Sequence, residues 1–250
     1  MTCGDPHPVP NVGIITQART TSTRLPGKVL LEVGGKPLLL HHLERLAMSA
    51  LPVFVATTVN RADEPILEIA RTAGTSVHRG SEADVLSRFN ECATTNELDV
   101  VVRVTSDCPL IDGRLIAQAV EEHLAASDPQ LYLSNTLERS FPRGFDFEVF
   151  SAAALAEAHS NGRGPDREHV TPYLYTNSTG RMKLRNISWP EDKSSYRITV
   201  DTPHDLEVVR RLIEGYGADA MTCAQIIGLL DAHPEIVAIN SHVDQKELGR

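Results

Sequence analysis

The stretch of residues 12–28 reads VGIITQARTTSTRLPGK and decides how the fold is interpreted. Its first four residues form an apolar run of strand length, after which the chain turns polar. Three fixed cations, Arg19, Arg24 and Lys28, follow together with several hydroxyl side chains. Because open α/β sheets bind ligands at the carboxyl ends of their strands, we expect these cations to gather there around a polyanion such as a nucleoside triphosphate. The alternative interpretation is a solvated basic loop.

Two common phosphate-binding motifs do not fit this stretch. A Walker loop needs Gly, four residues and then Gly-Lys-Ser/Thr, but Gly27-Lys28 is followed by Val29, and no glycine lies five positions before Gly27. The dinucleotide fingerprint G-x-G-x-x-G is missing between the expected first strand and helix. The sequence therefore disfavours a P-loop ATPase and a nicotinamide-dependent enzyme.

Size, charge and cysteine usage limit the class of protein. The 250 residues can form one large α/β domain, or one domain with a small appendage. The 24 Lys and Arg residues against 33 Asp and Glu give a net charge of -9, which disfavours broad binding to nucleic acid or anionic membranes, and no apolar run approaches the length of a membrane span. Cys3, Cys92, Cys108 and Cys223 show neither a zinc-site spacing nor a disulfide framework, so we expect a cytoplasmic protein with no membrane or nucleic-acid partner.

Apolar runs of strand length alternate with longer amphipathic stretches through the first half of the chain. The expected strands cover residues 12–16, 53–57, 76–78, 100–105 and 131–133. The expected helices cover residues 37–48, 63–73, 82–94 and 112–126. Such alternation predicts an α/β fold with a mostly parallel sheet flanked by helices.

The second half of the chain departs from this alternation. Residues 135–149 are rich in Arg, Pro, Gly and aromatic residues, and we expect an extended segment or hairpin that projects and then returns to the sheet. The tail from Ile236 is expected to be a short strand or a partner-binding segment. Further strands are expected at residues 181–188 and 197–200, and further helices at 204–214 and 223–231.

Two strand-like runs end in a carboxylate. The run of residues 100–105 leads to Asp107, and the run of residues 198–200 leads to Asp201. Two carboxylates delivered by different strand ends can hold Mg²⁺, which keeps several waters and takes its other oxygens from substrate phosphates. Asp201 has an alternative role as a helix start, because Asp, Thr and Pro are all favoured there.

The motifs of this chain resemble, in order, those of the spore-coat-polysaccharide type of cytidylyltransferases. That family is related to the enzymes that make CMP-activated acidic sugars, such as 3-deoxy-manno-octulosonate and sialic acid, and to phosphonate cytidylyltransferases. The resemblance covers residues 11–215 and starts with the string from Gln17 to Lys28. Six later motifs lie at residues 79–89, 103–112, 134–136, 142–150, 167–173 and 199–203.

The resemblance implies a Rossmann-like nucleotidyltransferase fold of the glycosyltransferase-A-like kind, with a small projecting segment. It implies an enzyme that transfers CMP from CTP to a small acidic acceptor, either a sugar acid or a phosphonate, and releases pyrophosphate. Mg²⁺ is the implied cofactor, held by Asp107 and Asp201, and a homodimer is expected by the same analogy. The expected division is a disordered lead at 1–10, which is Pro-rich, a nucleotidyltransferase domain at 11–233 with its acceptor and dimer region at 135–195, and a C-terminal tail at 234–250.

The resemblance also assigns roles to individual residues. The catalytic set is Arg19, Arg24, Lys28 and Asp107. The CTP-binding set is Gln17, Ala18, Arg19, Ser22, Thr23, Arg24, Lys28, Gly80, Ser81, Asp84, Arg103 and Ser106. The acceptor-binding set is Asn135, Arg143, Glu148, Arg167 and His169. These types suit the reaction, because phosphoryl transfer depends mainly on positioning and on electrostatic stabilisation.

Several of these assignments have structural alternatives. Asp84 can serve as an N-terminal helix charge, His169 as a satisfied core or interface histidine, and Glu148 as an anchor for Arg143 or Arg167. The chain also departs from the family, with Thr20-Thr21 in place of a small flexible pair and Ser106 in place of glycine. A β-branched pair stiffens the loop. The competing functions are a nucleotidyltransferase that uses another nucleoside triphosphate or a phosphate-ester acceptor, and a non-catalytic CTP-binding relative.

Overall fold

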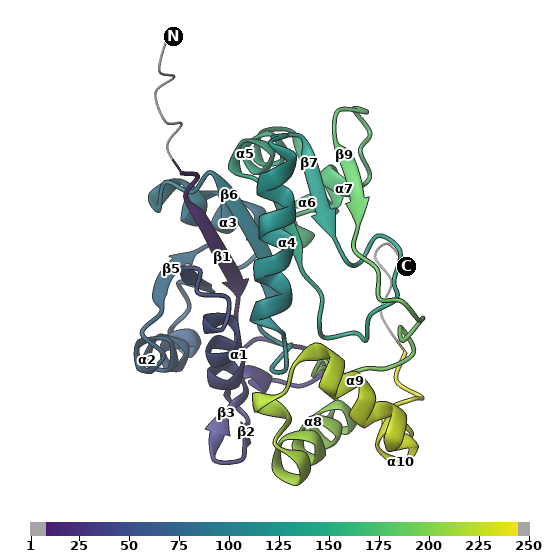
Figure 1. Ribbon diagram of the computed structural model, residues 1–250. Coiled ribbons are helices and arrows are strands. Elements are labelled where there is room, and N and C mark those ends of the chain that lie inside the picture. The colour runs from purple at the N-terminus through teal and green to yellow at the C-terminus, as the bar shows by residue number, and fades with distance from the viewer. Residues whose placement is uncertain (1–8, 245–250) are drawn as a thin grey trace.

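A computed structural model describes residues 9–244 of the chain (Figure 1). Most of the predicted disordered lead, residues 1–8, and the end of the predicted tail, residues 245–250, lie outside the described residues. Within residues 9–244, no helix is both long enough and apolar enough to cross a membrane.

The described part of the chain forms a seven-stranded sheet with the order β5-β4-β1-β6-β8-β7-β9. Strand β8 runs antiparallel to both of its neighbours, and the other neighbouring pairs are parallel. The predicted mostly parallel sheet is therefore confirmed, but β8 was not among the expected strands. The strands are β1 Val12–Gln17, β4 Val53–Thr58, β5 Ser76–Gly80, β6 Val100–Thr105, β7 Leu131–Ser134, β8 Glu148–Ser151 and β9 Lys183–Asn186.

Helices cover both faces of this sheet, because successive residues of the central strands point to opposite sides. Ile15 of β1 packs in a core with helix α3 (Val85–Thr95), whereas Ile14 packs with helix α4 (Gly113–Ala126). Figure 1 shows α4 lying across the front of the sheet. Burial on both faces explains why the central strands read as continuous apolar runs. The other helices are α1 Leu38–Ala47, α2 Glu64–Thr72, α5 Ala152–Asn161, α6 Pro165–His169, α7 Pro172–Tyr175, α8 Pro203–Tyr216, α9 Cys223–Ala232 and α10 Pro234–Val237.

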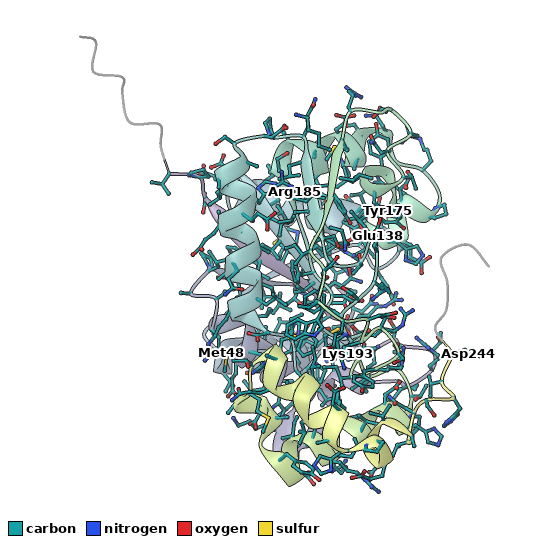
Figure 2. All side chains as sticks on the ribbon, turned by 45° about the vertical axis from the view of Figure 1, so that its right-hand side comes forward. Met48, Glu138, Tyr175, Arg185, Lys193 and Asp244 are labelled. Carbon is teal, nitrogen blue, oxygen red and sulfur yellow. The ribbon has the colours of Figure 1, made fainter. Side chains whose placement is uncertain are left out.

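A further core joins the C-terminal helices to the sheet. Helices α8, α9 and α10 pack against Leu110, Phe141 and Phe145 and against the small hairpin of β2 (Glu32–Val33) and β3 (Lys36–Pro37). In Figure 1 these helices lie below the carboxyl end of β1. Lys193, which Figure 2 labels beside these helices, precedes them in the chain. Its Nζ donates to the Oδ1 of Asp231 in α9 at 2.9 Å. The C-terminal helices thus pack beside the carboxyl ends of the strands, where the loops that carry the predicted site residues begin.

Three expectations about the second half of the chain were wrong or incomplete. The expected strand at residues 197–200 is an irregular segment whose Arg197 makes one isolated bridge to Arg143. The region 135–195 returns to the sheet as β8 and β9, but between them it forms the unpredicted helices α5, α6 and α7. The expected strand near Ile236 is helix α10, whose Ile236 is buried in the C-terminal core. Alternation in sequence does not form a strand without a neighbour to pair with.

Candidate active site

The loop after β1 is shaped by hydrogen bonds that its own threonines make. The amide of Gly27 donates to the carbonyl of Thr20 at 2.8 Å and closes the loop, with Gly27 at a φ of 67° that favours glycine. Thr20 donates to the Oδ1 of Asp63 through its amide at 2.8 Å and through its hydroxyl at 2.6 Å. Burial alone would raise the pKa of Asp63, but these donors and Thr58 bring it below its ordinary value. Thr20, where the family resemblance implied a small flexible residue, therefore anchors the loop to the residues after β4.

The predicted convergence of two distant carboxylates is present in the structure. The Nζ of Lys28 lies 2.9 Å from the Oδ2 of Asp107 and 2.8 Å from the Oδ1 of Asp201. The amide of Val200 donates to the carbonyl of Asp107 at 2.8 Å and holds the two segments side by side. Burial by itself lowers the pKa of Lys28, but the two carboxylates raise it above its ordinary value. The ammonium is therefore charged at neutral pH.

Asp201 is also contacted by two arginines. The Nη2 of Arg24 lies 2.8 Å from its Oδ2, and the Nη2 of Arg197 lies 2.7 Å from the same oxygen. The third expected cation, Arg19, lies elsewhere in the loop, with its guanidinium 3.6 Å from Glu82 and 43% of its side chain exposed. Two of the three cations therefore meet the carboxylates, and the third points to the loop between β5 and α3.

The carboxylates suit a small divalent cation. Asp107 and Asp201 share the single ammonium of Lys28, so their oxygens are close enough to contact one cation together. Within residues 9–244, no group of three or more His, Cys, Asp or Glu side chains is placed so that it could hold a metal ion. A pair of carboxylates matches Mg²⁺, which in phosphate-handling sites is held by one or two protein carboxylates. The donor set therefore fits the predicted ion.

The predicted base-binding loop between β5 and α3 is held internally. Asp84 caps α3, because its Oδ1 accepts from the amide of Ser87 at 2.9 Å, so its structural alternative is confirmed. Its Oδ2 accepts from the Nε of Arg167 at 3.0 Å. The amide of Asp84 donates to the Oγ of Ser81 at 3.0 Å. One residue of the predicted CTP set and one of the predicted acceptor set are thus paired with each other.

Arg103 of β6 is held by a buried carboxylate from β8. Arg103 donates to Glu148, and its Nη2 also lies 3.4 Å from the Oε1 of Gln17. The Oε1 of Glu148 accepts from the hydroxyls of Tyr132 at 2.5 Å and Thr171 at 2.8 Å. Glu148 therefore anchors Arg103, a partner that the sequence analysis did not consider, and its 7% exposure argues against direct contact with an acceptor.

Asn135 is a correction to the acceptor set. It is 1% exposed, its Nδ2 donates to the carbonyl of Phe145 at 2.8 Å, and its Oδ1 accepts from the amide of Phe147 at 3.0 Å. Both ends of the amide are thus occupied by the main chain, and we assign Asn135 to the support of this loop. The sequence pattern around Asn135 gave no indication of burial, because its partners Phe145 and Phe147 lie ten and twelve residues away, on the segment before β8.

The other predicted acceptor residues lie on different segments of the chain. Arg143 pairs through its main chain with residues 196–199, since its amide donates to the carbonyl of Tyr196 at 2.9 Å and its carbonyl accepts from Ile198 at 2.8 Å. His169 is half-buried, and this burial lowers its pKa. It precedes Val170, whose φ of 73° lies in the left-handed region, and its carbonyl accepts from the amide of Thr171 at 2.9 Å. A β-branched residue at this φ is strained backbone, of the kind often found at functional sites.

The remaining predicted residues lie at or just beyond the carboxyl ends of β1, β5 and β6. Ala18 and Ser106 are buried, and the amide of Ser106 donates to the carbonyl of Gln17 at 3.2 Å. Ser22 is half-buried and Thr23 is exposed, and Gly80 pairs with Thr58 at the end of β5.

Two further groups near this site were not predicted from the sequence. Glu82 accepts from the hydroxyl of Thr21 and from the Nδ2 of Asn60 at 2.6 Å, and so links three loops. Arg139 and Asp146 form a two-pronged ion pair at 3.1 and 2.9 Å on the loop before β8. A charged residue within the expected acceptor region could have indicated the second group, but no spacing rule indicates the first.

Comparison with known proteins shows the family. A sequence model of the family described as cytidylyltransferase matches residues 13–225 of this chain. The chain belongs to the cytidylyltransferase family. The resemblance drawn from the ordered motifs is thereby confirmed, and membership makes a nucleotidyltransferase enzyme the class of this protein.

Individual relatives and solved structures resemble the chain over most of its length. The spore coat polysaccharide biosynthesis protein SpsF of Bacillus subtilis is 30% identical, over 88% of this chain and 94% of that protein. A 3-deoxy-manno-octulosonate cytidylyltransferase of Geobacter metallireducens is 38% identical, over 82% of this chain and 91% of that enzyme. A solved cytidylyltransferase from Leptospira borgpetersenii is 35% identical and covers 96% of this chain and 100% of its own, with a TM-score of 0.88. The predicted Rossmann-like nucleotidyltransferase fold is confirmed.

Proposed function

We propose that this cytidylyltransferase transfers CMP from CTP to a small anionic acceptor, releases pyrophosphate and uses Mg²⁺ held by Asp107 and Asp201. The observation that carries the proposal is the contact of Lys28 with both carboxylates, at 2.9 and 2.8 Å, at the carboxyl end of the parallel strands. Cations for a triphosphate and carboxylates for a metal meet there at one point. A solvated basic loop would not bury its lysine among acids from two other segments.

The cations of the loop after β1 can pair either with the carboxylates of Asp107 and Asp201 or with the phosphates of a nucleotide. Lys28 contacts Asp107 and Asp201, and Arg24 contacts Asp201. A triphosphate would draw both side chains to its β- and γ-phosphates, with Ser22 and Thr23 as additional donors, and so free the carboxylates. Mg²⁺ held by these carboxylates would neutralise charge on the reacting phosphate and favour the attacking form of the acceptor. Arg19 would close on the phosphates from its exposed position beside Glu82.

Recognition of the base is assigned to Gln17, Gly80, Ser81 and Arg103. The guanidinium of Arg103 is fixed by Glu148 and lies beside the amide of Gln17. A fixed donor beside an amide that both donates and accepts can read the edge of a pyrimidine. We therefore expect CTP to be preferred over UTP and ATP.

The acceptor is assigned to a sugar acid or a small phosphonate. Arg143, Arg167 and His169, together with the Arg139–Asp146 pair, lie on the segments between β7 and α7. Arginine forks suit carboxylate and phosphonate oxygens alike. Similarity to the 3-deoxy-manno-octulosonate cytidylyltransferase of Geobacter metallireducens supports a sugar acid as the acceptor. We further propose a homodimer and a cytoplasmic location, which suits the three free cysteines among residues 9–244, all of them buried.

Pyrophosphate release from CTP across sugar acids, sugar phosphates and phosphonates tests the proposal. We expect release with CTP and with one class of anionic acceptor. Release with another nucleoside triphosphate, or with a phosphate ester alone, would point to the competing nucleotidyltransferase, and tight CTP binding without any release would point to a non-catalytic relative.

The metal assignment has its own test. Replacing Asp107 with Ala should abolish turnover at saturating Mg²⁺, whereas Asp128→Asn, which removes the charged partner of the exposed Lys183, should leave the rate unchanged. Activity of the Asp107 variant within a few-fold of the wild-type rate would refute the assignment.

A further inference from the structure

The carboxylate of Asp201 is delivered by an irregular segment, so something other than a strand must fix its direction. Residues 198–200 precede it without regular hydrogen bonding to a neighbouring strand, and α8 begins after Thr202. Its Oδ2 accepts from the Nη2 of Arg197 at 2.7 Å. The side chain of Arg197 is 5% exposed, so its buried guanidinium can hold the carboxylate of Asp201 in one direction. The position of Asp201 then depends on what holds Arg197.

Asp205 holds both Arg197 and the main chain of Asp201. Its Oδ1 accepts from the Nε of Arg197 at 2.8 Å, and its Oδ2 accepts from the amide of Asp201 at 3.0 Å. Its side chain is completely buried. Asp205 also forms the capping box of α8 with Thr202, but a capping box requires only the contacts at the helix start. The contacts with Arg197 and the amide of Asp201 go beyond that role.

A residue near the end of the described chain completes this network. Asn240, which follows α10 and lies outside the part matched by the family, is 3% exposed. Its Nδ2 donates to the Oδ1 of Asp205 at 2.8 Å and to the carbonyl of Arg197 at 3.0 Å. The side-chain amide of Asn240 thus connects the C-terminal segment to the network that holds Asp201. Buried amides of this kind are retained where they satisfy charged groups that would otherwise lack partners.

The charge balance gives this arrangement a consequence for metal binding. The guanidinium of Arg197 contacts two carboxylates, those of Asp201 and Asp205. Its positive charge is therefore shared between them and is not bound to Asp201 alone. A guanidinium bound wholly to Asp201 would compete with a cation for the same oxygens. We infer that Asp205, supported by Asn240, is a positioning residue that acts through Arg197 to keep Asp201 aimed and available for a metal ion. The inference rests on the proposed function, because it takes Asp201 as a metal ligand.

Binding of Mn²⁺ in the presence of CTP, measured by electron paramagnetic resonance on the full-length protein, tests this inference without turnover. Asp205→Asn keeps the size and the capping oxygen but removes the charge that holds Arg197. We expect its Kd for Mn²⁺ to rise by about 10- to 100-fold, as for other residues that orient metal ligands, while CTP binding without metal changes by less than about twofold. Asn240→Ala should raise the same Kd by a smaller factor of about three to ten.

The control is Thr222→Ala, which removes the capping box of α9 without touching the Arg197 network. It should lower the melting temperature as much as Asn240→Ala does and leave Mn²⁺ binding unchanged. Wild-type Mn²⁺ affinity in a folded Asp205→Asn or Asn240→Ala protein would overturn the inference and leave the proposed function intact. A wild-type protein that binds CTP but no Mn²⁺ would overturn the proposed function and this inference with it.

Discussion

The Nζ of Lys28 lies 2.8 Å from the Oδ1 of Asp201, although 173 residues separate the two in the chain. The same ammonium bonds to Asp107 at 2.9 Å, and both contacts are largely sheltered from solvent. Salt bridges at exposed positions contribute little to stability, but this one occupies the point where a triphosphate and a divalent ion would meet. Its partners are therefore expected to change during the reaction.

Replacing Lys28 with Met should lower kcat with CTP but raise the affinity for a metal ion in the absence of nucleotide. Loss of the ammonium should lower kcat by about 10²- to 10³-fold, as for other donors that stabilise charge in the transition state. Without nucleotide, the same variant should bind Mn²⁺ more tightly than the wild type, because Lys28 no longer occupies the carboxylates. Lys36→Met, which removes an exposed pair with Glu44, serves as the control. Equal Mn²⁺ affinity in the Lys28 variant and the wild type would contradict the exchange of partners.

Arg103→Lys should weaken selection of the base. A lysine cannot reproduce the planar fork that pairs with Glu148 and reaches Gln17, so an ordered donor is lost. We expect the KM for CTP to rise about tenfold, from the loss of a charged hydrogen bond, with a smaller preference for CTP over UTP. Steady-state kinetics with both nucleotides measures this. Arg71→Lys, at an exposed pair with Glu68, should change neither value. An Arg103→Lys enzyme with unaltered selectivity would exclude Arg103 from base recognition.

Stability should fall in mild acid because of His42. This buried histidine on α1 links the hydroxyl of Thr16 to the carbonyl of Cys108, each at 2.8 Å, and burial lowers its pKa from 6.5 to about 4. The neutral ring is favoured by folding, so the unfolded chain binds the extra proton. Its contribution is complete above pH 6.5 and is lost as the pH falls from 6.5 to about 4, by about 3 kcal/mol in total.

Urea unfolding of the wild type and of His42→Gln between pH 7 and pH 4 measures this contribution. The glutamine retains hydrogen-bonding groups but does not titrate, so the variant should lose less stability across this range. Parallel pH profiles for the two proteins would show that other groups account for the acid sensitivity.

Two glycines should respond to alanine in opposite ways. Gly144 has a φ of 117°, and an added Cβ would lie 2.8 Å from the amide nitrogen of Thr199, which is backbone and cannot move aside easily. We expect Gly144→Ala to destabilise the protein by about 3 kcal/mol and to displace the segment that leads to Asp201. Gly215 lies in α8 with no atom within 4 Å of an added Cβ, so Gly215→Ala should stabilise the protein by about 1 kcal/mol. Calorimetric melting of both variants checks the contrast, and equal effects would refute it.

Local patterns predicted the regular elements of the first half well. The expected helix at residues 112–126 is α4, Gly113–Ala126, because Asp112 caps its start and the periodic apolar residues pack on the sheet. The prediction of strands failed at two places in the second half, where pairing with distant segments decides whether a strand forms. Strand β8 is short and closely follows the Arg, Pro and Gly of residues 142–144, and it forms by pairing with β6 and β7. Residues 197–200 alternate like a strand but have no such partner.

The sequence by itself determined the order of the motifs, the ends of the central strands, and the residue types that those ends carry. Only the tertiary structure decided which charges meet: Lys28 with two carboxylates, Glu148 with Arg103, and Asp205 with Arg197. Asn240 joins that last pair from outside the matched motifs. Periodicity reports the environment of a residue over a few turns or one strand, whereas these pairs form between segments that are brought together by packing of the whole sheet and its helices.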